Sequence, residues 1–173
     1  MKSEKLLKDR ESVLKAIEGE FNAELFPAVL TEEGGAKVLS IIMKDLAQDG
    51  EDARGEFFFM PGSDDDEMQF FVNLVTISSD LVAENLAELM GAVSIINTFI
   101  IAGCFAIDPA GGSLIYRHTT EMTLDVDKDA MKERIDLSMG TAIQVVSQYA
   151  YVLLEVNEGK RKAETIPSLF LQE

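Results

Sequence analysis

The chain has 173 residues, of which 47% are hydrophobic, and its 31 acidic and 15 basic side chains give a formal net charge of −16. This hydrophobic fraction excludes a disordered chain and predicts a single domain with a real core. The negative charge repels phosphate, which argues against nucleic acid and anionic membrane surfaces as partners, and it favours encounter with basic proteins.

The N-terminal region is predicted to form a helix over residues 4–18, because its apolar residues recur at helical spacing. Pro27 and the pair Gly34-Gly35 interrupt this pattern, so residues 19–36 are interpreted as a connection with room for a short strand. The first residues interleave charges with Leu6 and Leu7, unlike a signal peptide. Together with a single cysteine, this favours a cytoplasmic location.

Three apolar runs follow, at 37–46, 56–60 and 68–77, and charged turns separate them. Such runs predict an antiparallel meander. The third run has apolar residues on both of its faces, so one face can pack on helices and the other needs a different cover. The side chains predicted to contact another protein on that second face are Phe57, Phe59, Phe70 and Val72. The alternative is that they fill the core.

A second helix is predicted to begin at Asp80, whose carboxylate suits an N-cap. One of its strips is uniformly small, which lets another backbone come close. That strip is interpreted either as packing on the protein's own sheet or as a dimer contact made by Ala83, Ala87, Gly91 and Ser94. The uncharged stretch between Glu88 and Asp108 is interpreted as a buried helix end leading into a buried strand, not as a membrane span.

Two further strands are predicted at 103–107 and 113–122, joined by a hairpin loop rich in Gly and Pro. A long final helix follows over residues 127–156, with Gly159 as its C-terminal cap. The element order is therefore α-β-β-β-α-β-β-α, an α+β fold with an antiparallel sheet packed against helices. It forms one domain over residues 1–157, and residues 158–173 are expected to be a tail that frays or docks on a groove.

The sequence offers no marked catalytic or metal site. His118 is the sole histidine, and no nucleophile elbow or His-Glu-x-x-His pattern accompanies it. Asp125, Asp127 and Asp129 imitate the start of a calcium loop, but the required glycine and final glutamate are missing, so capping of the last helix is the stronger interpretation. We therefore expect a protein that is not an enzyme and has no catalytic residue, no metal and no cofactor.

Residues 95–117 (IINTFIIAGCFAIDPAGGSLIYR) carry a resemblance to a known family. Their helix end with Asn97, the Gly-x-Phe-x-Ile-Asp strand, the glycine turn and the strand with Tyr116-Arg117 resemble the YbjN family and the related type III secretion chaperone-like fold. The resemblance covers roughly residues 4–156, mostly as topology. It implies a homodimer whose sheet or groove surfaces hold segments of other proteins, and it supplies no catalytic residues.

The sequence thus favours a non-catalytic protein-binding module, chaperone-like or regulatory, that acts as a homodimer with an unidentified protein client. The alternative is an enzyme or small-ligand binder with an unmarked acidic pocket. That alternative predicts carboxylates converging beside His118 or Arg117. Weak calcium binding at the acidic stretches 64–67 and 125–129 is a third hypothesis.

Overall fold

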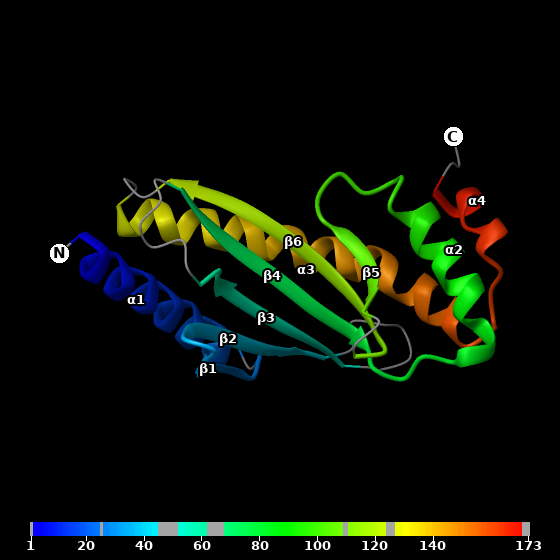
Figure 1. Ribbon diagram of the computed structural model, residues 1–173, viewed down its shortest axis with the longest axis horizontal. Coiled ribbons are helices and arrows are strands. Elements are labelled where there is room, and N and C mark those ends of the chain that lie inside the picture. The colour runs from blue at the N-terminus through cyan, green and yellow to red at the C-terminus, as the bar shows by residue number, and fades with distance from the viewer. Residues whose placement is uncertain are drawn as a thin grey trace.

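A strongly twisted antiparallel sheet forms the centre of the protein, and long helices pack against one of its faces (Figure 1). The computed structural model describes residues 2–24, 26–44, 52–61, 68–108, 111–123 and 127–170. The four longer helical segments are α1 (Lys2–Ala23), α2 (Leu86–Ile96), α3 (Lys128–Asn157) and the single-turn α4 (Pro167–Phe170). The 3-10 turns are η1 (Ala83–Asn85) and η2 (Ala163–Thr165).

The strands are β1 (Ala28–Glu33), β2 (Ala36–Met43), β3 (Ala53–Phe59), β4 (Met68–Ser78), β5 (Cys104–Asp108) and β6 (Ser113–Thr123). Their order across the sheet is β1-β2-β3-β4-β6-β5, and every neighbouring pair is antiparallel. The three strands of the predicted meander are β2, β3 and β4, and β1 adds a fourth strand at its edge. In the final hairpin the second strand, β6, lies next to β4, and the first strand, β5, lies at the edge of the sheet. The long β6 pairs along β4, and the short β5 pairs with β6 alone.

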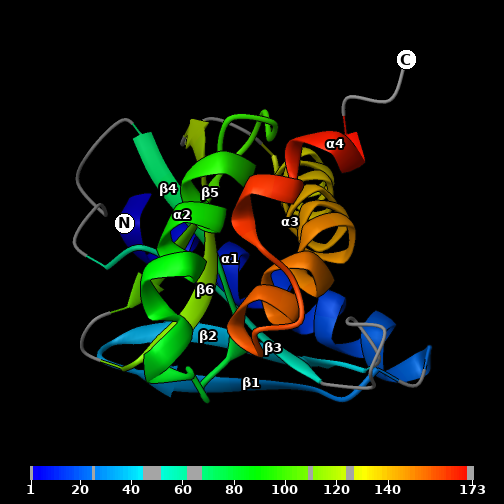
Figure 2. The same cartoon turned by 90° about the vertical axis from the view of Figure 1, so that its right-hand side faces the viewer.

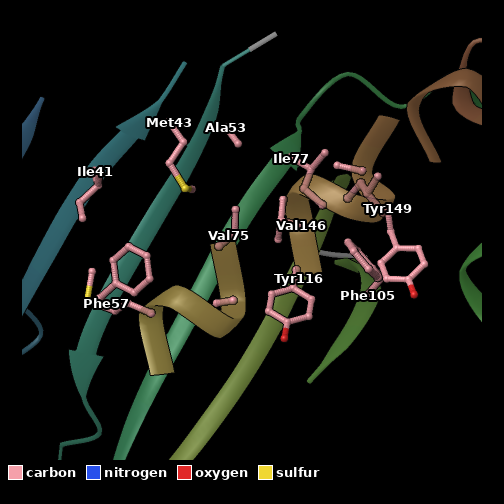
Figure 3. Close-up of a cluster of buried hydrophobic side chains, with 14 of the residues drawn as sticks. Ile41, Met43, Ala53, Phe57, Val75, Ile77, Phe105, Tyr116, Val146 and Tyr149 are labelled. Carbon is pink, nitrogen blue, oxygen red and sulfur yellow. The ribbon is translucent and has the colours of Figure 1, made fainter. Parts of the chain in front are cut away.

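Successive side chains along each strand point to opposite faces of the sheet, as the pleat requires. Leu39, Phe57 and Asn73 are opposite one another in the register and point to the side of α1 and α3, which we call the helix face. Figure 3 shows the core on this face, with Phe57, Val75 and Tyr116 pointing towards α3 side chains such as Val146. A buried apolar stripe on α3 fills this interface because its members recur every three or four residues.

The predicted fold class is confirmed, and the predicted elements follow one another as foreseen, except that four strands and not three precede α2. The structure adds β1 within residues 19–36, where room for a strand had been left. This strand is hard to recognise because its Thr-Glu-Glu end is polar, as an edge position allows.

The ends of the helices agree with the sequence at α3 and differ at α2. Asp127 caps α3 by accepting a hydrogen bond from the Ala130 N–H at 2.9 Å, and Gly159 follows its end with φ 75°. Asp80 does not cap α2, which begins at Leu86 after the η1 turn. The Asp80 N–H instead donates to the Ser78 hydroxyl at 3.2 Å.

The stretch from Glu88 to Asp108 comprises most of α2, a connection and β5, so it is not one continuous helix. Among the described residues, the helix long and apolar enough to cross a membrane by length and composition is α3. Its buried stripe packs on the sheet and on α2, which accounts for its hydropathy.

Of the two alternatives for the tail, fraying or docking on a groove, residues 158–170 show docking. Ala163 and Ile166 are buried, and the Phe170 ring packs on Tyr149 with centroids 5.0 Å apart. The docking of this segment has a simple cause. Apolar residues spaced at 163, 166 and 170 form one side of a short turn segment, and α2 and α3 together offer a surface on which that side is covered.

Candidate functional site

The face of the sheet opposite the helix face is the first candidate surface, and we call it the open face. α1 meets the sheet through Arg10, which hydrogen-bonds Gln69 and lies 4.9 Å from the Phe59 ring centroid. α3 meets it through Ser138, whose hydroxyl accepts from the Asn73 amide at 2.7 Å. Both contacts fall on the helix face, and Figure 1 shows α3 passing behind β4 and β6.

The centre of the open face is apolar. Val38, Phe58 and Val72 stand opposite one another on β2, β3 and β4 and form a continuous row. Apolar neighbours on the same face extend this row into what we call the open-face strip: Val38, Phe58, Phe70, Val72, Leu74 and Ile115. Most of its side chains are partly exposed, while Val72 in the middle is only 2% exposed.

Polar groups border this strip. Arg54 and Glu56 form an ion pair at 2.7 Å on β3, and Arg117 and Thr119 are exposed on β6. An apolar centre with a polar border is the usual anatomy of a protein-binding surface.

The structure separates the four residues that the sequence proposed for this surface. Phe70 and Val72 lie on the open face. Phe57 and Phe59 lie on the helix face with 0% and 6% exposure, so their assignment to a binding surface is wrong. The reason is the two-residue period of a strand: in the run Phe57-Phe58-Phe59 only the middle ring points to the open face. Phe58 is the residue that sequence reasoning missed, because three equal rings give no alternation to read.

The strip of small residues on η1 and α2 is a second candidate surface. Ala83, Ala87 and Ser94 are exposed, so the dimer contact proposed for them stays a prediction. Gly91 is already contacted within the chain, since a Cβ at this position would lie 3.8 Å from the Ala163 Cβ. Met90, 59% exposed, adds apolar surface beside the strip.

Both edges of the sheet are blocked by an asparagine side chain. At β1, the Asn22 carbonyl accepts from the Ala28 N–H at 3.0 Å, and its amide donates to the Ala28 carbonyl at 2.9 Å. At β5, Asn97 makes the same pair of bonds to Phe105, at 2.9 and 3.0 Å. Each side chain therefore occupies the outward N–H and C=O of one edge residue, which an added strand would need for pairing.

A third blocking contact lies at β1. The Leu30 N–H donates to the Glu18 carboxylate at 2.8 Å, so two successive outward amides of this strand are engaged by α1. The sequence identified Asn97 as part of a family pattern but gave it no role. The role depends on a backbone eight residues away.

A buried polar cluster lies between β4, β6 and α3, around the sole histidine. The Ser138 hydroxyl bonds the Asn73 amide and lies 2.6 Å from the Thr120 hydroxyl, and Asn73 also donates to the His118 carbonyl at 3.3 Å. Asn73 Oδ1 and His118 Nδ1 are buried without a hydrogen-bond partner. Burial lowers the pKa of His118, and a hydrogen bond to the Ser138 backbone partly offsets this effect.

The charged groups needed for an acidic pocket are dispersed in the described residues. His118 lies on the helix face and Arg117 on the open face, because they are successive residues of one strand. Within the described ranges, no three His, Cys, Asp or Glu side chains come together as a metal site would require. Of the proposed calcium stretches, residues 64–67 and Asp125 lie outside the described residues, and Asp127 serves as the cap of α3.

Cys104, the single cysteine, lies in an exposed position. It stands opposite Arg117 at the start of the edge strand β5, where its side chain takes the open face. Its neighbour in space, Tyr116, is buried on the other face, which raises the pKa of the phenol to about 12. The Tyr116 hydroxyl donates to the Ala102 carbonyl at 2.8 Å.

Comparisons with known proteins give similarity in structure. No family model and no curated protein matches the chain. It is similar to the crystal structure of YbjN, described as a putative transcription regulator from E. coli, at 9% identity over 78% of this chain and 89% of YbjN, with a TM-score of 0.43. It is also similar to an uncharacterized protein from Methanothermobacter thermautotrophicus, at 18% identity over 84% and 99% of the two chains, with a TM-score of 0.43. The resemblance drawn from residues 95–117 concerns this same YbjN fold.

Proposed function

We propose that this protein is a non-catalytic protein-binding module, chaperone-like or regulatory, which holds a segment of another protein on the open face of its sheet. The observation that carries the proposal is the open-face strip, an apolar row that crosses β2, β3 and β4 on the face opposite α1 and α3. Apolar surface gains roughly 25 cal/mol for each Å² removed from water, so a partner that covers the strip is favoured.

The blocked edges support binding through the face. Strand addition requires free N–H and C=O groups at an edge, and Asn22 and Asn97 engage those of Ala28 and Phe105. A partner therefore binds by side-chain contact with the strip, where affinity depends on shape and apolar area. The net charge of −16 favours a partner with basic residues around its apolar contact.

A homodimer is part of the proposal, with the outer side of α2 as its contact. Ala83, Ala87 and Ser94 are small and exposed, and Met90 and Leu86 add apolar area next to them. We expect light scattering to give twice the chain mass for the wild type and the single-chain mass for Ala87→Arg. A monomeric wild type would contradict this part of the proposal and leave the open face untouched.

The binding proposal is tested with a photo-crosslinking amino acid placed on the open face. Thr119 is exposed there, opposite Val72, and Gln144 on the outer side of α3 is an exposed control position. In cells, the probe at Thr119 should join the chain to a discrete protein that the probe at Gln144 does not capture. Adding Phe58→Lys to the Thr119 probe should abolish that adduct while the circular dichroism spectrum stays unchanged.

Identical adducts from the Thr119 and Gln144 probes, or none from either, would contradict the proposal. So would an adduct at Thr119 that persists in a folded Phe58→Lys chain. An adduct between two copies of this chain at Thr119 would replace the client by a dimer contact on the open face.

A further inference from the structure

The C-terminal segment lies along a groove between α2 and α3. Figure 2 shows this segment, in orange-red and red, passing between α2 in green and α3 in orange. After α3 the chain reverses at Gly159, and residues 160–170 then follow the groove as two short turns. We call residues 160–170 the C-terminal strap.

The first part of the strap is basic and lies on acidic side chains. Arg161 pairs with Glu155 at 2.6 Å, and Lys160 pairs with Glu158 at 2.6 Å. On the other side of the groove, Glu88 of α2 accepts from the Ala163 N–H at 2.7 Å and lies 4.0 Å from Lys162. The groove thus has acidic side chains where the strap is basic.

The second part of the strap is apolar and fills the groove. Ala163 lies against Gly91, and Ile166 is 0% exposed. The Phe170 ring lies between two aromatic side chains, with centroids 5.0 Å from Tyr149 and 5.7 Å from Phe99. These three apolar residues occupy one side of the strap at a spacing of three and then four residues.

From residue 163 onwards, the strap contacts α2 and α3 mainly through side chains, as a bound peptide contacts its receptor. Its backbone hydrogen bonds from residue 163 onwards close its own turns, such as Ile166 N to Ala163 O at 3.1 Å and Leu169 N to Ile166 O at 3.0 Å. Its backbone is joined to α2 by the Ala163 N–H, which donates to the Glu88 carboxylate at 2.7 Å. At the start of the strap, the Lys160 and Arg161 N–H groups also donate to the Glu155 backbone carbonyl of α3, at 2.8 and 3.2 Å. From residue 163 onwards, side chains provide most of the attachment, and side-chain attachment can be exchanged for an equivalent segment without rearranging the sheet.

We propose that the groove between α2 and α3 is a second docking site, which the C-terminal strap fills in cis and which takes a partner segment of the same chemistry. The partner segment has two or three basic residues, then a small residue, a branched aliphatic three positions later and an aromatic four positions after that. The strap itself is the template for this pattern. The proposal is independent of the open face, which lies on the opposite side of the sheet from α3.

The strap regulates the groove by competition. A tethered ligand has an effective concentration of the order of millimolar, so a free segment of equal affinity competes poorly until the strap is loosened. The apparent affinity for a partner is reduced by the fraction of molecules in which the groove is empty. The strap therefore acts as an autoinhibitory contact.

A reversible lock on the strap provides the test. Gly91 and Ala163 bring their Cβ positions to 3.8 Å, within the 3.5–4.5 Å range of a disulfide. The variant Gly91→Cys, Ala163→Cys, with Cys104→Ser to remove the natural thiol, joins the strap to α2 when oxidised and frees it when reduced. The probe is a fluorescent peptide with the sequence of residues 160–170.

We expect the reduced chain to bind this peptide at least tenfold more tightly than the oxidised chain. A full-length chain whose strap carries Ile166→Ala and Phe170→Ala should bind it at least tenfold more tightly than the wild type. A peptide carrying the same two changes should bind neither chain. Equal affinity in the oxidised and reduced forms, with circular dichroism showing both folded, would overturn the proposal.

If the cysteine variant does not fold, the Ile166→Ala, Phe170→Ala chain provides a second test of the proposal. Peptide binding by the folded Ile166→Ala, Phe170→Ala chain supports the groove, and absence of binding refutes it. Crosslinking at Thr119 on the open face is unaffected by either result. Failure of this inference is therefore distinguishable from failure of the proposed function.

Discussion

Replacing Asn97 by alanine should open one edge of the sheet and destabilise the protein by a calculable amount. The Asn97 side chain makes two hydrogen bonds to Phe105, one to its N–H at 2.9 Å and one to its carbonyl at 3.0 Å. Each such bond contributes about 1 kcal/mol net, and a buried group left without a partner costs about 1–3 kcal/mol. Water reaches this edge in part, so we expect the free energy of unfolding to fall by about 2 kcal/mol.

The measurement is urea unfolding followed by circular dichroism, with the melting temperature recorded in parallel. A loss of about 2 kcal/mol corresponds to a fall in Tm of about 4–8 °C for a chain of this size. Asn22→Ala removes the equivalent pair of bonds at β1 and should cost a similar amount. Gln144→Ala, at an exposed position on α3, is the control and should stay within about 0.5 kcal/mol of the wild type.

A second readout examines the edge itself. An unblocked edge strand is a template for pairing with another chain, so Asn97→Ala should associate more readily than the wild type at high protein concentration, as measured by light scattering. If Asn97→Ala unfolds within about 0.5 kcal/mol of the wild type, the bonds to Phe105 are not holding the edge and the reasoning is refuted.

Gly55→Ala should lower the free energy of unfolding by about 1–3 kcal/mol in urea titrations, because its Cβ would lie 2.5 Å from the buried Phe57 ring; no loss would show that the ring moves freely. Gly103→Ala should cost at least as much, since φ is 71° and a Cβ would lie 2.6 Å from the Arg117 carbonyl oxygen; a wild-type Tm would contradict this. Burial lowers the pKa of His118 below 6.5, so the unfolded state binds the proton more readily and stability falls as pH drops below 6.5. His118→Gln should reduce the change of the free energy of unfolding with pH between about pH 5.5 and 7. An unchanged pH dependence would exclude this histidine as its source.

Much of the fold could be predicted because it follows from local patterns. The meander was visible in its apolar runs, and α3 was located by its stripe and by the capping residues Asp127 and Gly159. The prediction for α2 was wrong at its start because Asp80 looks like a cap. In the structure, the Asn157 side chain binds this segment: its carbonyl oxygen accepts from the Val82 N–H at 3.0 Å, and its amide donates to the backbone carbonyl of Asp80 at 3.0 Å.

The candidate surfaces were predictable only in part. The sequence indicated that a strand such as β4 has apolar residues on both faces, and Phe70 and Val72 lie on the open face. It could not assign the three consecutive rings on β3, where register alone places Phe57 and Phe59 in the core and Phe58 on the open face. The small strip on α2 was recognised, but its contact with Ala163 depends on a segment more than 70 residues away.

Residue spacing and composition were enough to predict the α+β class, the antiparallel pairing of the strands and the acidic character of the surface. These properties follow from residue spacing and charge, which are local or additive. Only the tertiary structure decided which sheet face stays open, that Asn22 and Asn97 block the two edges, and that the last residues fill a groove between α2 and α3. Each of these depends on contacts between distant segments, and such contacts form only when the sheet register and the helix packing are both fixed.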